Sequence, residues 1–419
     1  MTAAISSGAP GTDRELARGL ARGLARAERA AKWRAAALTL PLLLFLLASF
    51  VLPIGALLAK SVVDTDIPRL LPGVAAALRG WPGTALPPED AYRALAGDIR
   101  AARDAGTLAS AATRLNYDVT GYRSLMFATA RRLPDPLPTD ARAALIEIDP
   151  QWGDIETWGA IKRASGPVTD FFLLAALDLK RDAAGHVVRE KDDETIFRTI
   201  LWRTLWIAGV VTLACLLLGY PVALYLAQQT ARKAALLLFL VLLPFWTSLL
   251  VRTVAWVVLL QREGVVNDAL ISMGLIGEPL KMIFNRFAVY VAMVHVLLPF
   301  MILPLYSVMK AIPPSYLRAA ASLGAPPLTA WLRVYLPQTL PGIGAGCLMV
   351  FIQALGYYVT PALVGGADDQ MISYFIAFYA SKTINWGMAA AMALILLATT
   401  MLLYGVYQRL IGLDRVRLA

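Results

Sequence analysis

The chain has 419 residues, of which 58% are hydrophobic and only 16% are charged. Its mean hydropathy is +0.60, a value that argues against a soluble domain and places the chain among integral membrane proteins. The formal net charge of +10 would suggest nucleic acid in a soluble protein. Here the basic residues lie mostly beside apolar segments, so membrane topology explains them and we expect no nucleic-acid partner.

Residues 1–34 lead with small and polar residues and continue as "RELARGLARGLARAERAAKWR". Leu16, Leu20 and Leu24 recur at every fourth position among arginines, which predicts a basic amphipathic helix at a membrane surface. The alternative is a solvated helix that only helps to set the orientation of the chain. Residues 1–34 do not have the pattern of a cleavable signal peptide.

Six apolar segments are long enough to span a membrane, since a helix needs roughly 20 residues to cross about 30 Å of hydrocarbon. Polar residues interrupt the fifth, which makes it the weakest of the six. The segments are residues 35–59, 201–227, 234–260, 287–309, 342–363 and 387–410.

Lysine and arginine flank these segments unequally. They are frequent in residues 1–34, between the second and third segments, in residues 310–341 and near the C-terminus. The short loops of the other side hold only Arg262, Lys281, Arg286 and Lys382. Because basic loops stay in the cytoplasm, both termini and residues 310–341 are predicted to be cytoplasmic.

The loop between the first two segments is long, has mixed charge and is predicted to lie outside the cytoplasm. Stretches such as "PEDAYRALAGDIRAARDAG" and "GPVTDFFLLAALDLKRD" favour helices, and a loop of this length can form a small core of its own. Trp152 and Trp158 are expected either to anchor that core or to rest at the membrane interface. The loop contains one histidine and no cysteine, and its carboxylates show no catalytic pattern.

These observations divide the chain into successive parts. They are a cytoplasmic basic amphipathic segment (1–34), a first transmembrane helix (35–60), a mainly helical periplasmic insertion (61–199), a five-helix core (200–411) with a cytoplasmic loop (310–341), and a cytoplasmic tail (412–419).

Few residues suggest chemistry, and we expect neither a catalytic site nor a metal site nor a bound cofactor. Cys215 and Cys347 each lie inside an apolar segment, as buried small residues do, and no Cys/His cluster has metal-ligand spacing. His295 would be a proton relay in a secondary transporter. With no acidic partner in the spans, ordinary helix packing is the favoured interpretation.

Residues 312–342, "IPPSYLRAAASLGAPPLTAWLRVYLPQTLPG", are too polar and too rich in proline to span a bilayer. Pro314 suits a first helical turn, and Gly324 suits the left-handed residue after a helix end. About ten helical residues, some 15 Å long, would lie between them, too few to be stable alone in water. Such a slim helix either enters a groove on another protein or lies beneath its own membrane domain.

This stretch resembles the "EAA" loop of ABC-importer permeases, a Glu-Ala-Ala, three residues, a Gly and a later Leu-Pro. Ala319, Ala320, Gly324, Leu336 and Pro337 match it. "LLPFWTSLLVRTVAWVVLL", "VLLPFMILPLYSVMKAIPPSYLRAAASLGA" and "VFIQALGYYVTPALVGG" also resemble spermidine/putrescine-type permeases, in the same order. The likeness covers the first span and residues 198–419. It implies an all-α integral membrane protein with six transmembrane helices in the type I ABC importer (MetI-like) arrangement.

The resemblance also implies partners. The loop would be a coupling helix that docks into a cytoplasmic ABC ATPase. This chain has no G-x-x-x-x-G-K-[ST] motif, so ATP would be used by that partner subunit. A second homologous permease, a periplasmic solute-binding protein and membrane lipid are the other expected partners. The docking residues carried over by position are Leu317, Arg318, Ala319, Ala320, Ala321, Ser322, Leu323, Gly324 and Ala325.

The translocation path is expected along the fifth segment, where polar residues cluster, because polar residues in spans usually face a bundle interior or a water-filled cavity. Interhelical hydrogen bonding without substrate contact is the alternative. Helical spacing predicts that Gln353 shares a face with Tyr357 or Thr360. The residues assigned to the path are Trp246, Thr247, Gln353, Tyr357, Tyr358 and Thr360.

Three positions depart from the family pattern. Arg318 stands where the family usually has Glu, Ser322 where an acidic residue is frequent, and Tyr357 where many polyamine-type relatives carry Glu. The last change weakens the attraction for a polycation, since a tyrosine offers only a ring face and a hydroxyl. Arg252, toward the outer end of the third segment, is expected to snorkel or, as a second choice, to line the outer vestibule.

The sequence therefore predicts a multi-pass permease subunit of the bacterial inner membrane, not an enzyme, that imports a small solute. A polyamine such as spermidine or putrescine is the leading substrate. An amino acid or another small organic compound is the alternative, and an ion-coupled secondary transporter is a third hypothesis.

Overall fold

The computed structural model describes residues 32–33, 36–182, 185–190 and 195–411. The predicted amphipathic helix of residues 1–34, apart from 32–33, and the tail 412–419 lie outside the described residues. The chain divides into two units, Met1–Ala59 and Lys60–Ala419, and each is described by itself.

The first unit contributes one apolar helix, Ala36–Ala59, whose 24 residues cover about 36 Å and so exceed the hydrocarbon thickness. Its middle is a π-helical turn, η1 (Leu47–Val51), and it ends as α2 (Leu52–Ala59). The wider turn ends two residues before Pro53, whose nitrogen has no hydrogen to donate to the preceding turn. The helix matches the extent of the predicted first span.

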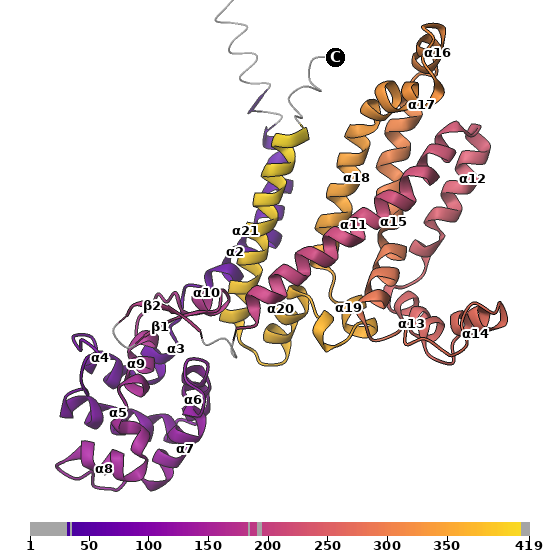
Figure 1. The fold of residues 1–419 in the computed structure, drawn as a ribbon. Helices are drawn as coiled ribbons and strands as arrows, with labels where there is room; N and C mark the ends of the chain where they lie inside the picture. The colour runs from indigo at the N-terminus through magenta and orange to yellow at the C-terminus, as the bar shows by residue number, and fades with distance from the viewer. Residues whose placement is uncertain (1–31, 34–35, 183–184, 191–194, 412–419) are drawn as a thin grey trace, which may run out of the picture. The chain divides into compact units, whose positions relative to one another are not determined.

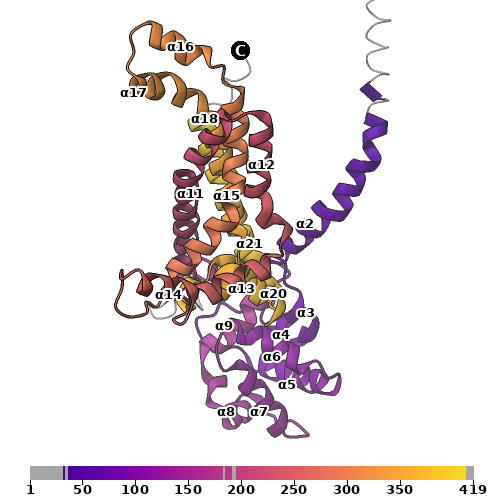
Figure 2. The same cartoon turned by 90° about the vertical axis from the view of Figure 1, so that its right-hand side faces the viewer.

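The second unit begins with a compact group of helices within the 61–199 segment (Figures 1 and 2). Three large aromatic residues, Tyr92, Trp152 and Trp158, are fully buried in its core. Of the two environments expected for Trp152 and Trp158, the structure therefore shows the core and not the membrane interface. The elements are α3 (Asp66–Leu70), α4 (Pro72–Ala77), α5 (Glu89–Asp104), α6 (Leu108–Asn116), α7 (Tyr122–Arg132), α8 (Ala141–Ile148), η2 (Pro150–Gly153) and α9 (Ile155–Ala164).

The end of this segment differs from the predicted helix over residues 166–182. A five-residue helix, α10 (Phe171–Ala175), is followed by an antiparallel hairpin of β1 (Leu179–Arg181) and β2 (Val187–Arg189). The helix cannot continue because Asp178 adopts a left-handed conformation with φ of 56°. The prediction of a continuous helix here was wrong.

The rest of the second unit is the membrane core, in which α11, α15 and α18 pack against one another (Figure 1). Its elements are α11 (Phe197–Gln228), α12 (Ala231–Leu242), η3 (Leu243–Trp246), α13 (Leu249–Leu260), α14 (Val265–Ser272), α15 (Arg286–Ala311), α16 (Ser315–Ser322), α17 (Pro327–Ala330), η4 (Trp331–Tyr335), α18 (Leu336–Gly356), α19 (Val359–Val364), η5 (Ala367–Asp369), α20 (Ile372–Ser381) and α21 (Trp386–Ile411).

Glycines allow these helices to approach closely. A Cβ added at Gly346 of α18 would lie 2.7 Å from the Met301 Sδ of α15, and one at Gly342 would lie 3.0 Å from the Val308 Cβ. Small residues at such crossings bring backbones together and increase van der Waals contact, which is what holds helices together in lipid.

The number of spans agrees with the prediction only if one bent pair counts as a single span. Among the described residues five helices are long and apolar enough to cross a membrane, and the pair α12/α13 makes up to six. The all-α, multi-span fold class is therefore confirmed. Helices α11, α15 and α21 cover the predicted second, fourth and sixth spans.

The predicted third and fifth spans were wrong as continuous helices. Residues 234–260 break after η3, and the two halves are bent by 92°. Pro244 lies at this break, and the Ser248 hydroxyl starts α13 by accepting from the Val251 N–H at 3.2 Å. The fifth span runs from Pro327 to Gly356 and stops there, because Tyr357 is extended.

Candidate functional site

The residues at the two ends of α16 limit it to a short helix. Pro314 lies directly before the first turn and not in it, one position earlier than predicted. Gly324 has a left-handed φ of 82°, as the sequence predicted. The Gly324 and Ala325 N–H groups donate to the carbonyls of Ala321 and Ala320 at 3.0 and 3.1 Å, which satisfies acceptors that a helix end leaves free. The helix has eight residues and is thus slightly shorter than expected.

One face of α16 is attached to the protein and the other is exposed. Ala320 is buried and Leu317 packs against the membrane core, so these two of the nine predicted docking residues face their own chain. Ala325 is half-buried, and Arg318, Ala319, Ala321, Ser322, Leu323 and Gly324 are exposed. Leu323 is 89% exposed, the highest value of any large apolar side chain among the described residues. Leu328 of α17 is a second exposed apolar residue, at 67%. Sequence reasoning missed it because the family motif does not include this position.

The base of α16 is connected to two long helices. Lys310, at the end of α15, donates from Nζ to the carbonyls of Ala227 and Gln229 at 3.0 and 2.9 Å and so caps the end of α11. A groove of about 450 Å³ lies between these ends and is lined by Pro314, Leu317 and Trp331, among others. The first turn of α16 and the ends of α11 and α15 therefore border the same groove.

The predicted path residues fall at the opposite end of the core, around two helix breaks (Figure 1). Trp246, at the break after α12, is 81% exposed, and the Thr247 hydroxyl donates to the Pro244 carbonyl at 2.8 Å. Both residues lie at the bend between α12 and α13, so the bend and not a regular helix face sets where their side chains point.

The remaining four predicted path residues do not share one helical face, because α18 ends at Gly356. Gln353 is half-buried and has no hydrogen-bond partner in the part of the chain that the structure describes. Tyr357 is half-buried, and Tyr358 is 44% exposed. Thr360 is fully buried, with its Oγ1 3.2 Å from that of Thr253, the interhelical hydrogen bond of the alternative hypothesis.

Arg252 and His295 lie among aromatic residues near the same break. The Trp256 indole donates to His295 Nδ1 at 3.2 Å, a contact expected for helix packing. The Arg252 guanidinium carbon lies 5.9 Å from the centre of the Phe245 ring. Its Nε and Nη1 are buried without a partner among the described residues, which disagrees with a snorkelling head group. The second choice, that Arg252 lines the outer vestibule, stays a prediction.

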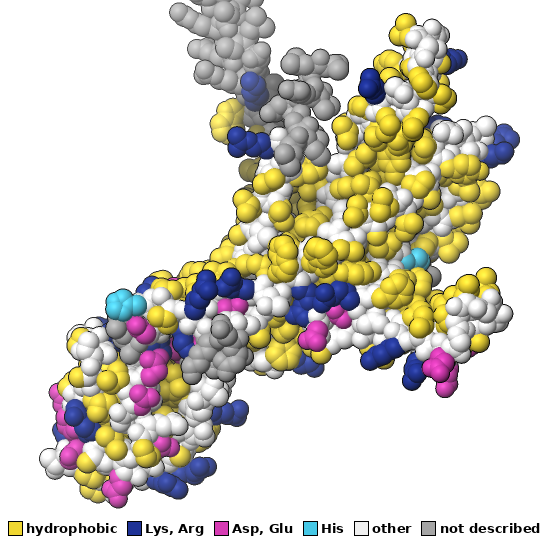
Figure 3. All heavy atoms as spheres, viewed as in Figure 1, with side chains coloured by type: hydrophobic (Ala, Val, Ile, Leu, Met, Phe, Trp, Pro, Cys, Tyr) yellow, Lys and Arg dark blue, Asp and Glu magenta, His cyan; other side chains and the backbone are white. Residues whose placement is uncertain are grey.

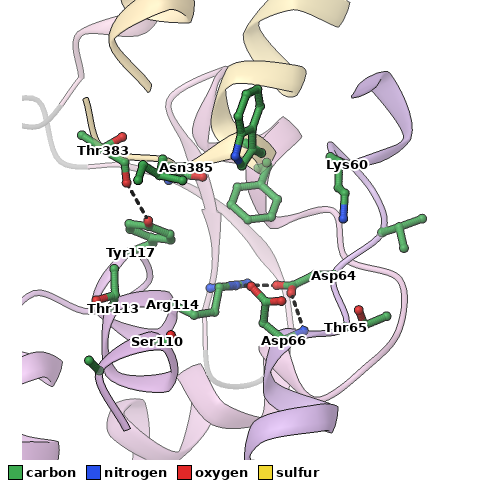
Figure 4. Close-up of a pocket in the computed structure, with 16 residues that line it drawn as sticks. Lys60, Asp64, Thr65, Asp66, Ser110, Thr113, Arg114, Tyr117, Thr383 and Asn385 are labelled. Carbon is green, nitrogen blue, oxygen red and sulfur yellow. Dashed lines mark hydrogen bonds and ion pairs between the residues drawn. The ribbon is translucent and has the colours of Figure 1, made fainter. Parts of the chain in front are cut away.

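A cavity of about 470 Å³ lies where the 61–199 segment meets the loop before α21 (Figure 4). Arg114 of α6 forms a buried ion pair with Asp64, and its guanidinium carbon lies 5.1 Å from the rings of both Phe171 and Phe172. The Tyr117 hydroxyl donates to the Thr383 carbonyl at 3.5 Å. Sequence reasoning missed this junction, since 50 residues separate Asp64 from Arg114 and no local pattern connects them.

Two further contacts connect the 61–199 segment to the membrane helices. The Asp178 carboxylate is buried and accepts from the N–H groups of Ile196, Phe197 and Arg198 at 2.8 to 3.1 Å, so it caps the start of α11. Phe172 packs on α21 where Gly387 leaves room, and a Cβ there would lie 2.4 Å from the ring. The segment is thus fastened to α11 and α21.

Apolar helices long enough to span a membrane, a short helix held out at one end and polar residues at helix breaks together define a transport permease. Residues 202–412 match the family described as the binding-protein-dependent transport system inner membrane component, and the chain belongs to this family. The 61–199 segment lies outside the matched residues.

Two permeases of 37–38% identity agree with this assignment. The spermidine/putrescine transport system permease protein PotB of Haemophilus influenzae is 38% identical over 214 residues, 51% of this chain and 75% of the relative. PotB of Escherichia coli K12 is 37% identical over 216 residues, 52% and 78% of the two chains. A solved bacterial alginate ABC transporter in complex with an alginate pentasaccharide-bound periplasmic protein is similar with a TM-score of 0.43 and 18% identity, covering 51% of this chain and 77% of its own.

The chain is therefore the permease subunit of an ABC importer, a multi-pass protein of the inner membrane and not an enzyme. A permease of this class works with a separate ATPase subunit and with a solute-binding protein. Among the described residues no group of three or more His, Cys, Asp or Glu side chains is placed to hold a metal ion.

Proposed function

We propose that this permease imports a polyamine of the spermidine/putrescine class, delivered by a periplasmic binding protein and driven by a cytoplasmic ATPase. The main observation in support is that the membrane core matches permeases named for spermidine and putrescine over about three quarters of their length. The exposed rings of Trp246 and Tyr358 support it, because aromatic faces attract ammonium groups.

The substrate is tested by reconstituting the permease with its ATPase and binding protein in vesicles and measuring ATP-dependent uptake of labelled spermidine and putrescine. We expect uptake that unlabelled polyamines inhibit and amino acids do not. Uptake of an amino acid in preference to polyamines would support the alternative substrate class. Uptake driven by an ion gradient without ATP would support a secondary transporter instead.

The ATPase docks, in this proposal, on the exposed face of α16 and α17. Leu323 and Leu328 supply the apolar contact, and Arg318 meets a carboxylate of the ATPase. The other role for Arg318, contact with lipid phosphates, predicts that its removal leaves the affinity for the ATPase unchanged. No cofactor is assigned to this chain, since ATP would be bound by the partner.

Replacing Gly324 by Asp tests this docking. The left-handed conformation at this position strains a residue with a side chain, and the new charge enters the proposed interface. We expect ATPase-coupled uptake to be abolished while the chain still inserts into the membrane. Thr329→Asp, on the half-buried side of α17, is the matched control for added charge. Near wild-type uptake by Gly324→Asp would exclude docking through this helix.

Both termini and α16 are proposed to face the cytoplasm, and a second homologous permease is proposed to complete the path. The charge distribution along the sequence supports the orientation. Accessibility of a single cysteine placed at Leu323 or at exposed Glu147, measured in right-side-out vesicles, distinguishes the two orientations. Labelling at Leu323 from outside would reverse the assignment.

The helices of the 61–199 segment are proposed to form a landing surface for the binding protein. They leave and rejoin the chain at a two-stranded stem, since Val63 pairs with Val168 and the Asp64 N–H donates to the Pro167 carbonyl at 3.2 Å. Residues 67–164 can therefore be replaced by a short glycine-rich linker without removing Asp178, the cap of α11. Loss of binding-protein docking is the expected result, and unchanged docking and uptake would overturn this role.

A further inference from the structure

A second cavity, of about 550 Å³, lies at the start of α11, outside the surfaces assigned above. In Figure 3 dark blue and magenta side chains meet near this point at the border of the yellow, apolar surface. The cavity combines two indole rings, two guanidinium groups and one carboxylate. Its lining residues are Thr199, Trp202, Arg203, Trp206, Arg286 and Asp368.

The charged groups of this cavity are only partly used by the protein. Arg203 donates from Nη1 to the Asp368 carbonyl, and its Nε is buried. Its Nη2 is not buried and has no hydrogen-bond partner among the described residues. Arg286 donates from Nε to Asp369 Oδ1 at 2.9 Å, and its side chain remains 45% exposed. The Asp368 side chain is exposed and has no ion-pair partner in the described chain. Free N–H groups and a free carboxylate therefore border the same space.

An apolar track leads away from this cavity along α11. Trp202 and Trp206 are 68% and 53% exposed, and Leu213 and Leu217 are 56% and 67% exposed. Their spacing of four, seven and four residues places all four on one face of the helix. From Trp206 to Leu217 the track extends for about 16 Å, roughly half of the ~30 Å hydrocarbon thickness. The track is therefore about as long as the hydrocarbon layer of one leaflet is thick.

We propose that this cavity binds the head group of a zwitterionic aminophospholipid of the phosphatidylethanolamine class. The phosphate accepts from the free N–H groups of Arg203 and Arg286, the primary ammonium donates to the Asp368 carboxylate, and the acyl chains lie along the track on α11. Guanidinium groups are the preferred protein partners of phosphate, and tryptophan favours the level of the head groups.

The charge balance selects this lipid over an anionic one. Arg203 and Arg286 contribute two positive charges and Asp368 and Asp369 two negative charges, so the site as a whole has no net charge to attract an anion. A choline head group has no N–H to donate to Asp368. A lipid that carries both a phosphate and a primary ammonium satisfies both kinds of unpaired group.

Native mass spectrometry of the purified full-length chain tests the proposal, with phosphatidylethanolamine, phosphatidylcholine and phosphatidylglycerol of identical acyl chains added in turn. We expect phosphatidylethanolamine to be retained about tenfold more than the other two. The double variant Arg203→Gln/Arg286→Gln should lose this retention, and Asp368→Asn should bind phosphatidylethanolamine and phosphatidylcholine equally. Millimolar inorganic phosphate should not displace the lipid, whereas displacement would show a free-phosphate site and overturn the proposal.

Arg198→Gln is the matched control, because Arg198 is exposed one turn earlier on α11 and does not line the cavity. Since the Arg203 variant also removes the hydrogen bond to Asp368, Trp206→Ala provides an independent test that leaves that bond intact. It should weaken retention of phosphatidylethanolamine, with unchanged thermal stability. Equal retention of all three lipids, or no difference from Arg198→Gln, would overturn the proposal. So would a photo-reactive residue at Trp206 that cross-links to a second permease chain instead of lipid.

Discussion

The 61–199 segment and the membrane core are packed by different means, although both are helical. In the first, large aromatic side chains fill the interior and their polar atoms are hydrogen-bonded. The Trp152 indole donates to the Thr129 hydroxyl at 2.8 Å, and the Tyr122 hydroxyl donates to the Thr157 carbonyl at 2.7 Å. In the second, glycines let helices touch, methionine and leucine side chains fill the interior, and exposed tryptophans such as Trp202 and Trp246 point outward.

The difference follows from the surroundings of each part. In water, a small domain is stabilised by removing apolar area from solvent, and a few large rings do this efficiently. In lipid, an apolar side chain gains little by being buried, so close van der Waals contact between backbones decides the packing. The two parts should therefore respond to opposite kinds of substitution, removal of volume in one and addition of volume in the other.

The largest effect is expected from Trp152→Ala in the 61–199 segment. Removing a fully buried ring leaves a cavity and should cost about 3–5 kcal/mol of that segment's stability. Limited proteolysis of the full chain in vesicles should show cleavage within residues 66–164 while the membrane helices stay protected. Trp246→Ala, which removes an 81% exposed ring, is the control. Equal proteolytic resistance of Trp152→Ala would contradict a separate aromatic core.

An intermediate effect is expected from Gly346→Val in α18. The new side chain overlaps Met301, and overpacking typically costs about 1–3 kcal/mol. The midpoint of thermal unfolding in detergent should fall, without new cleavage in residues 66–164. Gly209→Val on α11, where nothing lies within 4 Å of an added Cβ, should change it little. A similar loss in both variants would show that β-branching and not helix contact is responsible.

A smaller effect is expected from Asp178→Asn, at the boundary of the two parts. Asparagine tolerates the left-handed conformation, so the change mainly removes the negative charge that caps α11 and should cost about 1 kcal/mol. Hydrogen exchange of the Phe197 and Arg198 amides should become faster. Asp182→Asn, in the turn of the hairpin, is the control and should leave these amides unchanged.

The smallest effect concerns pH and Asp98 of α5. Burial raises the pKa of this carboxyl above its ordinary value, and N–H groups of Val74 and Gly73 offset the increase in part. The folded segment therefore binds the proton more tightly than the unfolded chain, and its stability gains as pH falls through the raised pKa. As pH is lowered from neutral to about pH 4, the midpoint of thermal unfolding of the wild type should rise relative to that of Asp98→Asn. Exposed Asp104→Asn should show no such trend, and parallel curves for wild type and Asp98→Asn would contradict the prediction.

Much of the membrane core could be predicted because its signals are local. Long apolar runs identify α11, α15 and α21, and Pro314 and Gly324 delimit α16 within one or two residues. The predicted path was less accurate, since the breaks at Pro244 and Gly356 separate residues that helical spacing would place together. Whether those residues contact the solute stays a prediction.

The sequence by itself determined the class of the protein, most of its spans and the short helix α16, because hydrophobicity, proline and glycine act on the residues nearest to them in the chain. Only the tertiary structure decided which face of α16 is free, how Asp64 and Arg114 meet, and that Asp178 caps α11. Those contacts join residues far apart in the chain, and their free energy depends on burial and geometry that appear only when the helices have packed.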